Sequence, residues 1–389
     1  MSFKIQKSLL ITLGALAAFG PMTIDLYLPA FVEIGKDLLV PTEDIQYSLT
    51  SFLAGLSIGQ LIYGPLSDRF GRKIPLLTGI IVFIITSVLI SFVNSLESLV
   101  ILRFIQALGS CVGMVITRAI IRDMFEPREA AKVFSLVILI MGAAPIVAPL
   151  LGTQILLLSN WRVIFIFLAL FGFLTLLGSI YKIPETLKKS IPAKKGFLNY
   201  FYLLKDKQFM VATLVCGTIS AGMFSYIAGS AFVFLNIFKV SATTYPIIFG
   251  SNALAFIICS QINARLLNTH SIDAILRKAV VVAFMAATLT FVTIFFELSL
   301  PYFLVSLLCT IGTIGFIMPN ITAKALEFQQ ERAAVASAMM GSIQFCISSL
   351  GSVLVTVFSN GTAWPMVLTI LIFNSLTFLL YYIGIERKP

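Results

Sequence analysis

Long apolar segments alternate with short polar ones along almost the whole chain. Twelve of the apolar segments come close to the roughly 20 residues that a helix needs to cross the hydrocarbon core of a bilayer. We therefore predict an all-α integral membrane protein with twelve transmembrane helices. The predicted helices span residues 8–29, 45–63, 74–93, 98–120, 132–157, 161–181, 209–235, 245–264, 276–296, 301–322, 333–357 and 364–384.

A long polar stretch at residues 183–208 lies at the middle of the chain and divides the predicted helices into two sets of six. We predict an N-terminal six-helix bundle over residues 1–182, a cytoplasmic linker, and a C-terminal six-helix bundle over residues 209–389. A short internal repeat supports this division, because residues 128–133 before the fifth helix resemble residues 331–336 before the eleventh. Two repeated halves of this kind are common in secondary transporters.

The balance of charge is strongly basic, with 27 Lys and Arg against 17 Asp and Glu and a net charge of +10. Most of the basic residues lie in alternate short segments between apolar runs, which is the bias of cytoplasmic loops in a multi-pass membrane protein. Both termini are therefore predicted to be cytoplasmic. The lysines of the linker are expected to contact anionic lipid headgroups rather than nucleic acid.

Sequence patterns of enzymes and metal sites are missing. The chain has no zinc-protease, nucleophile-elbow or ATP-binding pattern, so we expect neither an enzyme nor a cofactor. The cysteines form no Cys-x-x-Cys pair, so we expect no metal site. They lie singly in apolar runs, at Cys111, Cys216, Cys259, Cys309 and Cys346.

One carboxylate, Asp25, falls in the outer third of the first predicted helix. An ionisable group in a transmembrane segment costs about 3 kcal/mol on insertion scales, and is therefore a candidate for function. Arg103 falls at a similar depth in the fourth helix, which runs in the opposite direction. We predict that Asp25 and Arg103 couple transport to protons. The alternatives are an aspartate wetted at the outer interface and an arginine that only anchors a helix end.

Residues 64–73, between the second and third predicted helices, read Gly-Pro-Leu-Ser-Asp-Arg-Phe-Gly-Arg-Lys. This pattern resembles the signature loop of the major facilitator superfamily of transporters. The resemblance implies a cluster of charges that closes the cytoplasmic side in one state and is hydrated in the other. The predicted latch consists of Gly64, Asp68, Arg69, Gly71, Arg72, Arg122 and Asp123.

Two further segments resemble motifs of the proton antiporters in this superfamily. Residues 102–109 of the fourth helix contain Arg103, with Ala107 where the motif has glycine. Residues 142–152 of the fifth helix contain two prolines among small residues, which kink a helix and allow close packing. The predicted hinge consists of Gly142, Pro145, Pro149 and Gly152.

Polar side chains inside the predicted helices either join neighbouring helices or line a cavity, and the sequence does not separate these roles. The candidates for a substrate cavity are Tyr27, Gln106, Arg118, Tyr226, Asn252, Asn320 and Gln344.

Residues 20–30, 59–68 and 118–123 together resemble the bicyclomycin-resistance (Bcr/CflA-type) drug:proton antiporters of bacterial inner membranes. The resemblance implies a protein that exports small drugs or drug-like metabolites in exchange for protons, driven by the proton gradient without a cofactor. We expect a monomer, because nothing in the sequence requires a larger assembly. Some members of the wider group carry a second acidic residue deeper in the first helix. Residues 13–19 here contain no acid, which favours neutral or zwitterionic substrates over strongly cationic ones.

Two other hypotheses stay open. A transporter of the same fold that exports or imports one specific metabolite would share every feature above, because a fold does not fix the substrate. A membrane receptor or assembly factor without transport would leave the matching depths of Asp25 and Arg103 unexplained.

Overall fold

The computed structural model describes residues 7–125, 127–187, 201–327 and 333–386. These residues are almost entirely helical, and twelve helical segments are long and apolar enough to cross a membrane. The prediction of an all-α protein with twelve spans is confirmed. Residues 331 and 332 of the internal repeat lie outside the described residues.

The first part of the chain forms α1 (Lys7–Asp25), η1 (Leu28–Ala30), α2 (Phe31–Asp37), η2 (Thr42–Ile45), α3 (Gln46–Phe70), α4 (Lys73–Ile90), α5 (Leu96–Met124), α6 (Pro127–Leu158) and α7 (Trp161–Lys182). The second part forms α9 (Lys207–Phe232), η3 (Val233–Ile237), α10 (Tyr245–Leu266), α11 (Ile272–Phe295), α12 (Leu300–Leu326), α13 (Ala333–Val357), α14 (Trp364–Tyr381) and η5 (Tyr382–Glu386). Both η3 and η5 are π-helical extensions of the helices before them.

The chain separates into two compact units, Met1–Val40 with Ser51–Asn199 and Pro41–Thr50 with Tyr200–Pro389. The boundary after residue 199 lies inside the predicted linker. Residues 41–50 group with the second unit, where the Thr50 and Ser352 hydroxyls are 2.6 Å apart.

In the first unit, α1 packs against α5, α6 and α7, and α4 packs against α5 and α7. Glycines allow these helices to approach backbone to backbone. A side chain at Gly113 of α5 would collide with the Leu16 carbonyl of α1, and one at Gly109 would meet the backbone of α4. Small residues are the usual means of close helix packing in membranes, since lipid offers no hydrophobic force to drive association.

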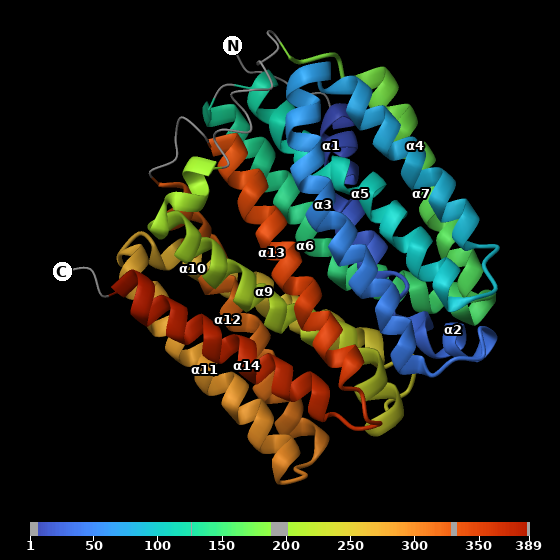
Figure 1. The fold of residues 1–389 in the computed structure, drawn as a ribbon, viewed down its shortest axis with the longest axis vertical. Coiled ribbons are helices and arrows are strands. Elements are labelled where there is room, and N and C mark those ends of the chain that lie inside the picture. Colours follow the sequence, from blue (N-terminus) through green and yellow to red (C-terminus); the bar gives the residue numbers. More distant parts are fainter. Residues whose placement is uncertain (1–6, 126, 188–200, 328–332, 387–389) are drawn as a thin grey trace. The chain divides into compact units, whose positions relative to one another are not determined.

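In the second unit, α9 packs against α12, α13 and α14, and α12 also contacts α10 and α11. Figure 1 shows the yellow-green α9 beside the orange α13. Gly351 of α13 approaches the Ala221 carbonyl of α9, and Gly315 of α12 approaches the Phe256 carbonyl of α10.

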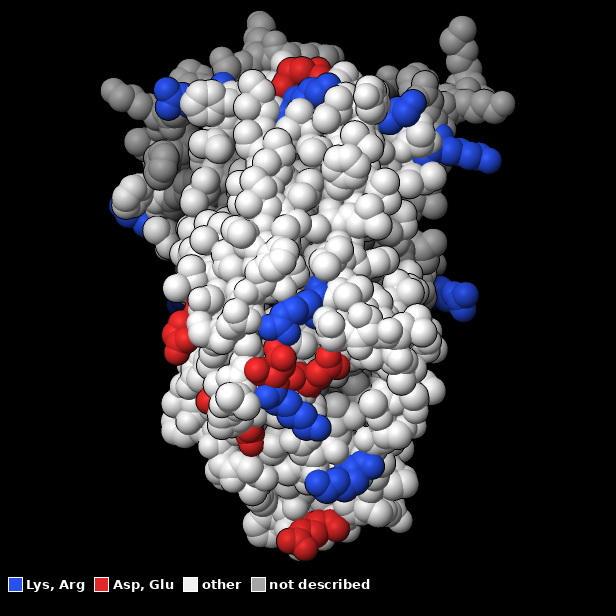
Figure 2. Space-filling model, turned by 90° about the vertical axis from the view of Figure 1, so that its right-hand side faces the viewer, with Lys and Arg blue, Asp and Glu red and all other residues white. Residues whose placement is uncertain are grey.

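Figure 2 shows one face of the molecule, on which charged side chains gather near the upper edge and in the lower half and leave a white band between them.

Several helix ends differ from the predictions, and three of them lie at the candidate sites. α1 ends at Asp25 rather than residue 29, because the chain bends at residues 26 and 27 before η1 begins. α3 continues to Phe70 and α5 to Met124, beyond the predicted ends at residues 63 and 120. Hydropathy marks only the part of a helix that lies in hydrocarbon, whereas backbone hydrogen bonds continue into water. Most of the predicted 64–73 loop is therefore the last part of α3.

Candidate functional site

The candidate proton site begins where α1 ends. Asp25 is the last residue of α1, and it is only 4% exposed. Within the described ranges, its carboxylate has no hydrogen bond and no ion pair. The carboxyl end of a helix carries a partial negative charge, so this position disfavours a second negative charge. Asp25 is therefore a buried carboxyl group whose ionised form has no hydrogen-bond or ion-pair partner in the part of the chain that the structure describes.

Arg103 of α5 is completely buried and is held by neutral groups. Its Nη1 donates to Gln106 Oε1 at 2.7 Å, and its Nη2 donates to the Thr23 carbonyl at 3.2 Å. The guanidinium carbon lies 4.1 Å from the ring centre of Tyr27 and 4.3 Å from that of Phe52. Aromatic faces attract a cation, and the attraction is strongest where water is absent.

The hydrogen bonds of Arg103 extend across three helices. Gln106 donates through Nε2 to the Ser87 hydroxyl of α4 at 2.7 Å, so that Thr23, Arg103, Gln106 and Ser87 form one chain from α1 through α5 to α4. The Nε of Arg103 is buried and has no acceptor among the residues described. Two of the predicted cavity residues, Tyr27 and Gln106, are thus buried parts of the Arg103 environment.

The structure therefore places Arg103 next to the helix end that carries Asp25 without an ion pair between them in the described part of the chain. Arg103 binds the carbonyl of Thr23, two residues before Asp25. A buried charge without a partner of opposite sign costs several kcal/mol. An ionised Asp25 that moved towards Arg103 would reduce that cost, and a protonated Asp25 would not.

The predicted hinge in α6 lies against the same helix end. α6 stays helical through Pro145 and Pro149. A side chain at Gly152 would collide with the carbonyl of Leu26, the residue that follows Asp25. Gly152 thus lets α6 touch the turn after the candidate proton site. Gly142, nearer the start of α6, is partly exposed.

Contacts with the start of α7, which the sequence analysis did not identify, fix the segment beyond Asp25. The backbone N–H of Trp161 donates to Glu33 Oε1 at 3.0 Å, and its indole Nε1 donates to Asp37 Oδ2 at 3.1 Å. Arg162 forms an ion pair with Asp37 at 2.5 Å. These bonds hold α2 against α7, and they join residues more than 120 positions apart in sequence.

The predicted latch residues Asp68, Arg72 and Asp123 are brought together. Arg72 is 3% exposed; its Nη1 donates to Asp68 Oδ1 at 2.6 Å and its Nε donates to Asp123 Oδ2 at 2.9 Å. Arg122 lies at the edge, with its Nε 3.8 Å from Asp123 Oδ1. Burial acts to lower the pKa of Arg72, but its hydrogen bonds to Asp123 and Asp68 and the attraction of their charges outweigh burial and raise the pKa. We call Asp68, Arg72 and Asp123 the charge cluster.

The other predicted latch residues lie around the charge cluster. Gly71 has a φ of +88°, a left-handed conformation that glycine adopts without strain. Arg69 points its guanidinium at Phe70, 5.0 Å from the ring centre, and makes no ion pair among the described residues. Gly64 lies within α3.

Glu185, which the sequence analysis missed, contacts this loop from beyond α7. Its Oε1 accepts from the backbone N–H of Arg72 at 2.9 Å and its Oε2 from that of Lys73 at 3.1 Å. From sequence alone, a glutamate at the edge of a charged linker is interpreted as a solvent-exposed residue without a specific role. The available signal was its position four residues after the predicted helix 161–181, at the end predicted to be cytoplasmic.

The candidates in the second unit join helices to one another. Asn252 Nδ2 donates to the Tyr226 hydroxyl at 3.3 Å, which ties α10 to α9. Asn320 Nδ2 donates to Asn263 Oδ1 at 2.7 Å, which ties α12 to α10. Gln344 Nε2 of α13 donates to a serine of α9, Ser220, at 2.8 Å.

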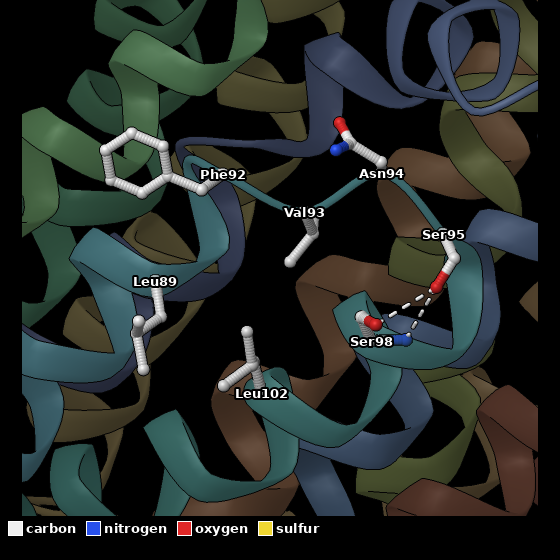
Figure 3. Close-up of a pocket in the computed structure, with 7 residues that line it drawn as sticks. All are labelled: Leu89, Phe92, Val93, Asn94, Ser95, Ser98 and Leu102. Carbon is white, nitrogen blue, oxygen red and sulfur yellow. Dashed lines mark hydrogen bonds between the residues drawn. The ribbon is translucent and has the colours of Figure 1, made fainter.

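A shallow pocket of about 450 Å³ lies at the turn between α4 and α5. Figure 3 shows Ser98 bonded to Ser95 on one side of it and Leu102 below. None of the predicted cavity residues lines this pocket. Arg118, the remaining candidate, is exposed and has no ion pair among the described residues.

Comparison with known proteins identifies the family. The sequence model described as Major Facilitator Superfamily matches residues 11–356. The chain belongs to the major facilitator superfamily. This membership makes the protein a membrane-embedded transporter of small molecules rather than an enzyme, as the sequence analysis predicted.

Several relatives of this superfamily match over nearly the whole chain. An uncharacterized transporter of Bacillus subtilis, YdgK, is 39% identical over 93% of this chain and 92% of its own length. A bicyclomycin resistance protein homolog of Haemophilus influenzae is 31% identical over 98% of both chains. The multidrug resistance protein MdtL of Escherichia coli O157:H7 is 30% identical over 94% of this chain and 92% of its own length.

Solved structures of the superfamily share the fold. The xylose transporter XylE of Escherichia coli has a TM-score of 0.74 with 15% sequence identity, over 98% of both chains. At this identity the likeness establishes the major facilitator fold and leaves the substrate open.

Proposed function

We propose that this transporter exports small drugs or drug-like metabolites across the bacterial inner membrane in exchange for protons. It works by alternating access, with both termini in the cytoplasm. The observation that carries the proposal is the arrangement at the end of α1, where the buried Asp25 comes two residues after the carbonyl that the buried Arg103 binds, and neither has a partner of opposite charge among the described residues. The family and the printed names of the bicyclomycin and multidrug resistance relatives support drugs as the substrate class.

Proton exchange at Asp25 gives this arrangement two states of different energy. When Asp25 is protonated, the end of α1 is neutral, and Arg103 keeps its bonds to Gln106 and the Thr23 carbonyl. When Asp25 loses its proton, the carboxylate and the guanidinium attract each other across a site of low dielectric. Movement of the α1 end relative to α5 then depends on protonation, which is what antiport requires.

The test uses inverted membrane vesicles that contain the protein, energised by respiration, with a fluorescent dye that reports internal pH. Bicyclomycin and chloramphenicol are added one at a time to the wild type, to Asp25→Asn and to the control Asp44→Asn, which removes an acid outside the site. Drug-induced proton release in the wild type and the control, and none in Asp25→Asn, supports antiport through Asp25. If Asp25→Asn responds like the wild type, Asp25 is not the coupling group. If no variant responds to a broad drug panel, drug export is wrong.

A further inference from the structure

Glu185 holds the amino end of α4. Its Oε1 accepts from the N–H of Arg72, the residue that caps α4, and its Oε2 accepts from the N–H of Lys73, the first residue of α4. Free N–H groups at a helix start attract an anion, because the helix dipole is positive there. Burial acts to raise the pKa of Glu185, but backbone hydrogen bonds from Arg72, Leu187, Lys73 and Thr186 outweigh it and hold the pKa below the usual value.

The residues around the Glu185 carboxylate leave space for this contact and add further bonds to it. A side chain at Gly71 would collide with the Glu185 carboxylate, so the glycine leaves the space that the carboxylate fills. The next residue, Thr186, donates its hydroxyl to Asp123 Oδ2 at 3.4 Å. Lys73 Nζ donates to the Ile180 carbonyl near the end of α7 at 3.0 Å. The segment after α7 is thus bound to the α3–α4 connection and to the charge cluster.

The backbone that Glu185 fixes is the backbone of Arg72. Arg72 reaches Asp68 on α3 and Asp123 on α5 from a connection of only two residues between helices. A small rotation of that connection would move the guanidinium away from one of its two carboxylates. Glu185 restrains such a rotation, because its carboxylate accepts hydrogen bonds from the backbone N–H groups of Arg72 and of its neighbour Lys73.

We propose that Glu185 is the positioning residue of the charge cluster, and that it makes the start of the inter-unit linker a part of the latch. The inference rests on the proposed function, in which the charge cluster opens and closes during transport. Glu185 touches neither the substrate nor the proton. It sets the geometry in which Arg72 bridges α3 and α5, so that Glu185 and Thr186 move when the cluster opens.

The test compares Glu185→Ala, Glu185→Gln and a matched control, Glu97→Gln, which changes an exposed glutamate in the first turn of α5. Drug-dependent proton release with chloramphenicol gives KM and Vmax, and hydrogen–deuterium exchange reports the amides of residues 70–76. We expect Vmax to fall roughly fivefold in Glu185→Ala with KM unchanged, at the low end of usual coupling effects. Exchange at residues 70–76 should accelerate, and Glu185→Gln, which keeps one carbonyl acceptor, should lie between Glu185→Ala and the wild type.

A second background separates positioning from general stability. In Asp123→Asn the charge cluster is already broken, so adding Glu185→Ala should lower Vmax no further. Equal fractional losses in both backgrounds would mean that Glu185 acts elsewhere and would overturn the proposal, as would wild-type exchange at residues 70–76 in Glu185→Ala. If the wild type moves no protons with any drug, the proposed function fails, and the exchange measurement alone then decides whether Glu185 holds the loop.

Discussion

Replacement of Arg103 by methionine should leave the protein folded and abolish transport. Methionine resembles the apolar stem of arginine, but it is shorter because it lacks the guanidinium group, and it carries no charge and no donor. The substitution removes a cation that is completely buried without an acidic partner among the described residues. The substitution therefore both removes stabilising contacts and relieves the cost of burying a charge. The size of each effect follows from the contacts of Arg103.

The losses come from two hydrogen bonds and three ring contacts, the most distant of which is with Phe165 at 5.8 Å from the ring centre. Bonds from a charged donor contribute about 1.5–3 kcal/mol each, so the bonds to Gln106 and the Thr23 carbonyl account for about 3–6 kcal/mol. The cation–π contacts with Tyr27 and Phe52 add about 2 kcal/mol. The gain is relief of the desolvation cost of one buried ion, also several kcal/mol. The net change in the free energy of unfolding should lie within about 2 kcal/mol of zero.

Thermal unfolding of the purified protein in detergent measures this balance. A net change of about 2 kcal/mol corresponds to a Tm shift of no more than about 8 °C, and of less for a chain longer than 250 residues. Drug-induced proton release in vesicles measures transport, which should be lost because no cation remains to attract ionised Asp25. Unfolding more than 15 °C below the wild type would refute the reasoning, since Arg103 would then be a structural residue. Full transport activity in Arg103→Met would refute it equally.

Three more outcomes follow from the same contacts. Arg72→Lys loses the fork that spans Asp68 and Asp123, and Vmax for chloramphenicol-dependent proton release should fall about tenfold, while the exposed control Arg265→Lys keeps the wild-type rate. Gly152→Val should lower Tm, because overpacking against Leu26 costs about 1–3 kcal/mol; an unchanged Tm contradicts that packing. The pKa of Glu185 is lower in the folded protein than in the unfolded chain, where it is about 4.3. Its contact therefore stabilises the fold fully above the unfolded-state pKa, and this stabilisation is lost as the pH falls through the folded-state pKa. The Tm difference between wild type and Glu185→Gln should therefore stay constant from pH 6 to 8, and a change within that range contradicts this assignment.

Helix spans were predictable because lipid leaves a chain segment few choices. Backbone groups in hydrocarbon must bond within the segment, so a long apolar run is a helix. The same logic located Asp25 and Arg103, since each is an exception to that environment. Prediction from hydropathy failed at the helix ends, because hydropathy does not indicate that α1 ends at Asp25 or that α3 continues to Phe70.

Contacts between distant residues escaped prediction for a different reason. Glu185 binds Arg72 across 113 positions, and no local pattern links a linker glutamate to a helix start. The rings around Arg103 show the same limit, because Tyr27 comes from the bend after α1 and Phe52 from α3. The sequence indicates that Arg103 is buried, because it lies in an apolar segment. Which groups compensate its charge depends on how three helices pack, and the sequence does not indicate that.

One helix, α5, contributes a residue both to the candidate proton site and to the charge cluster. α5 carries Arg103 near one end and Asp123 near the other, 20 residues apart, which is about 30 Å of helix. Gly109 and Gly113, between them, bring α5 against the backbones of α4 and α1. A helix packed this closely transmits a displacement rather than absorbing it. If proton loss at Asp25 shifts α5, as the proposed antiport mechanism requires, we expect Asp123 to move relative to Arg72, whose backbone N–H binds Glu185. We therefore expect that breaking the charge cluster alters the pH dependence of transport, although the proposed proton site is Asp25 and not a member of the cluster.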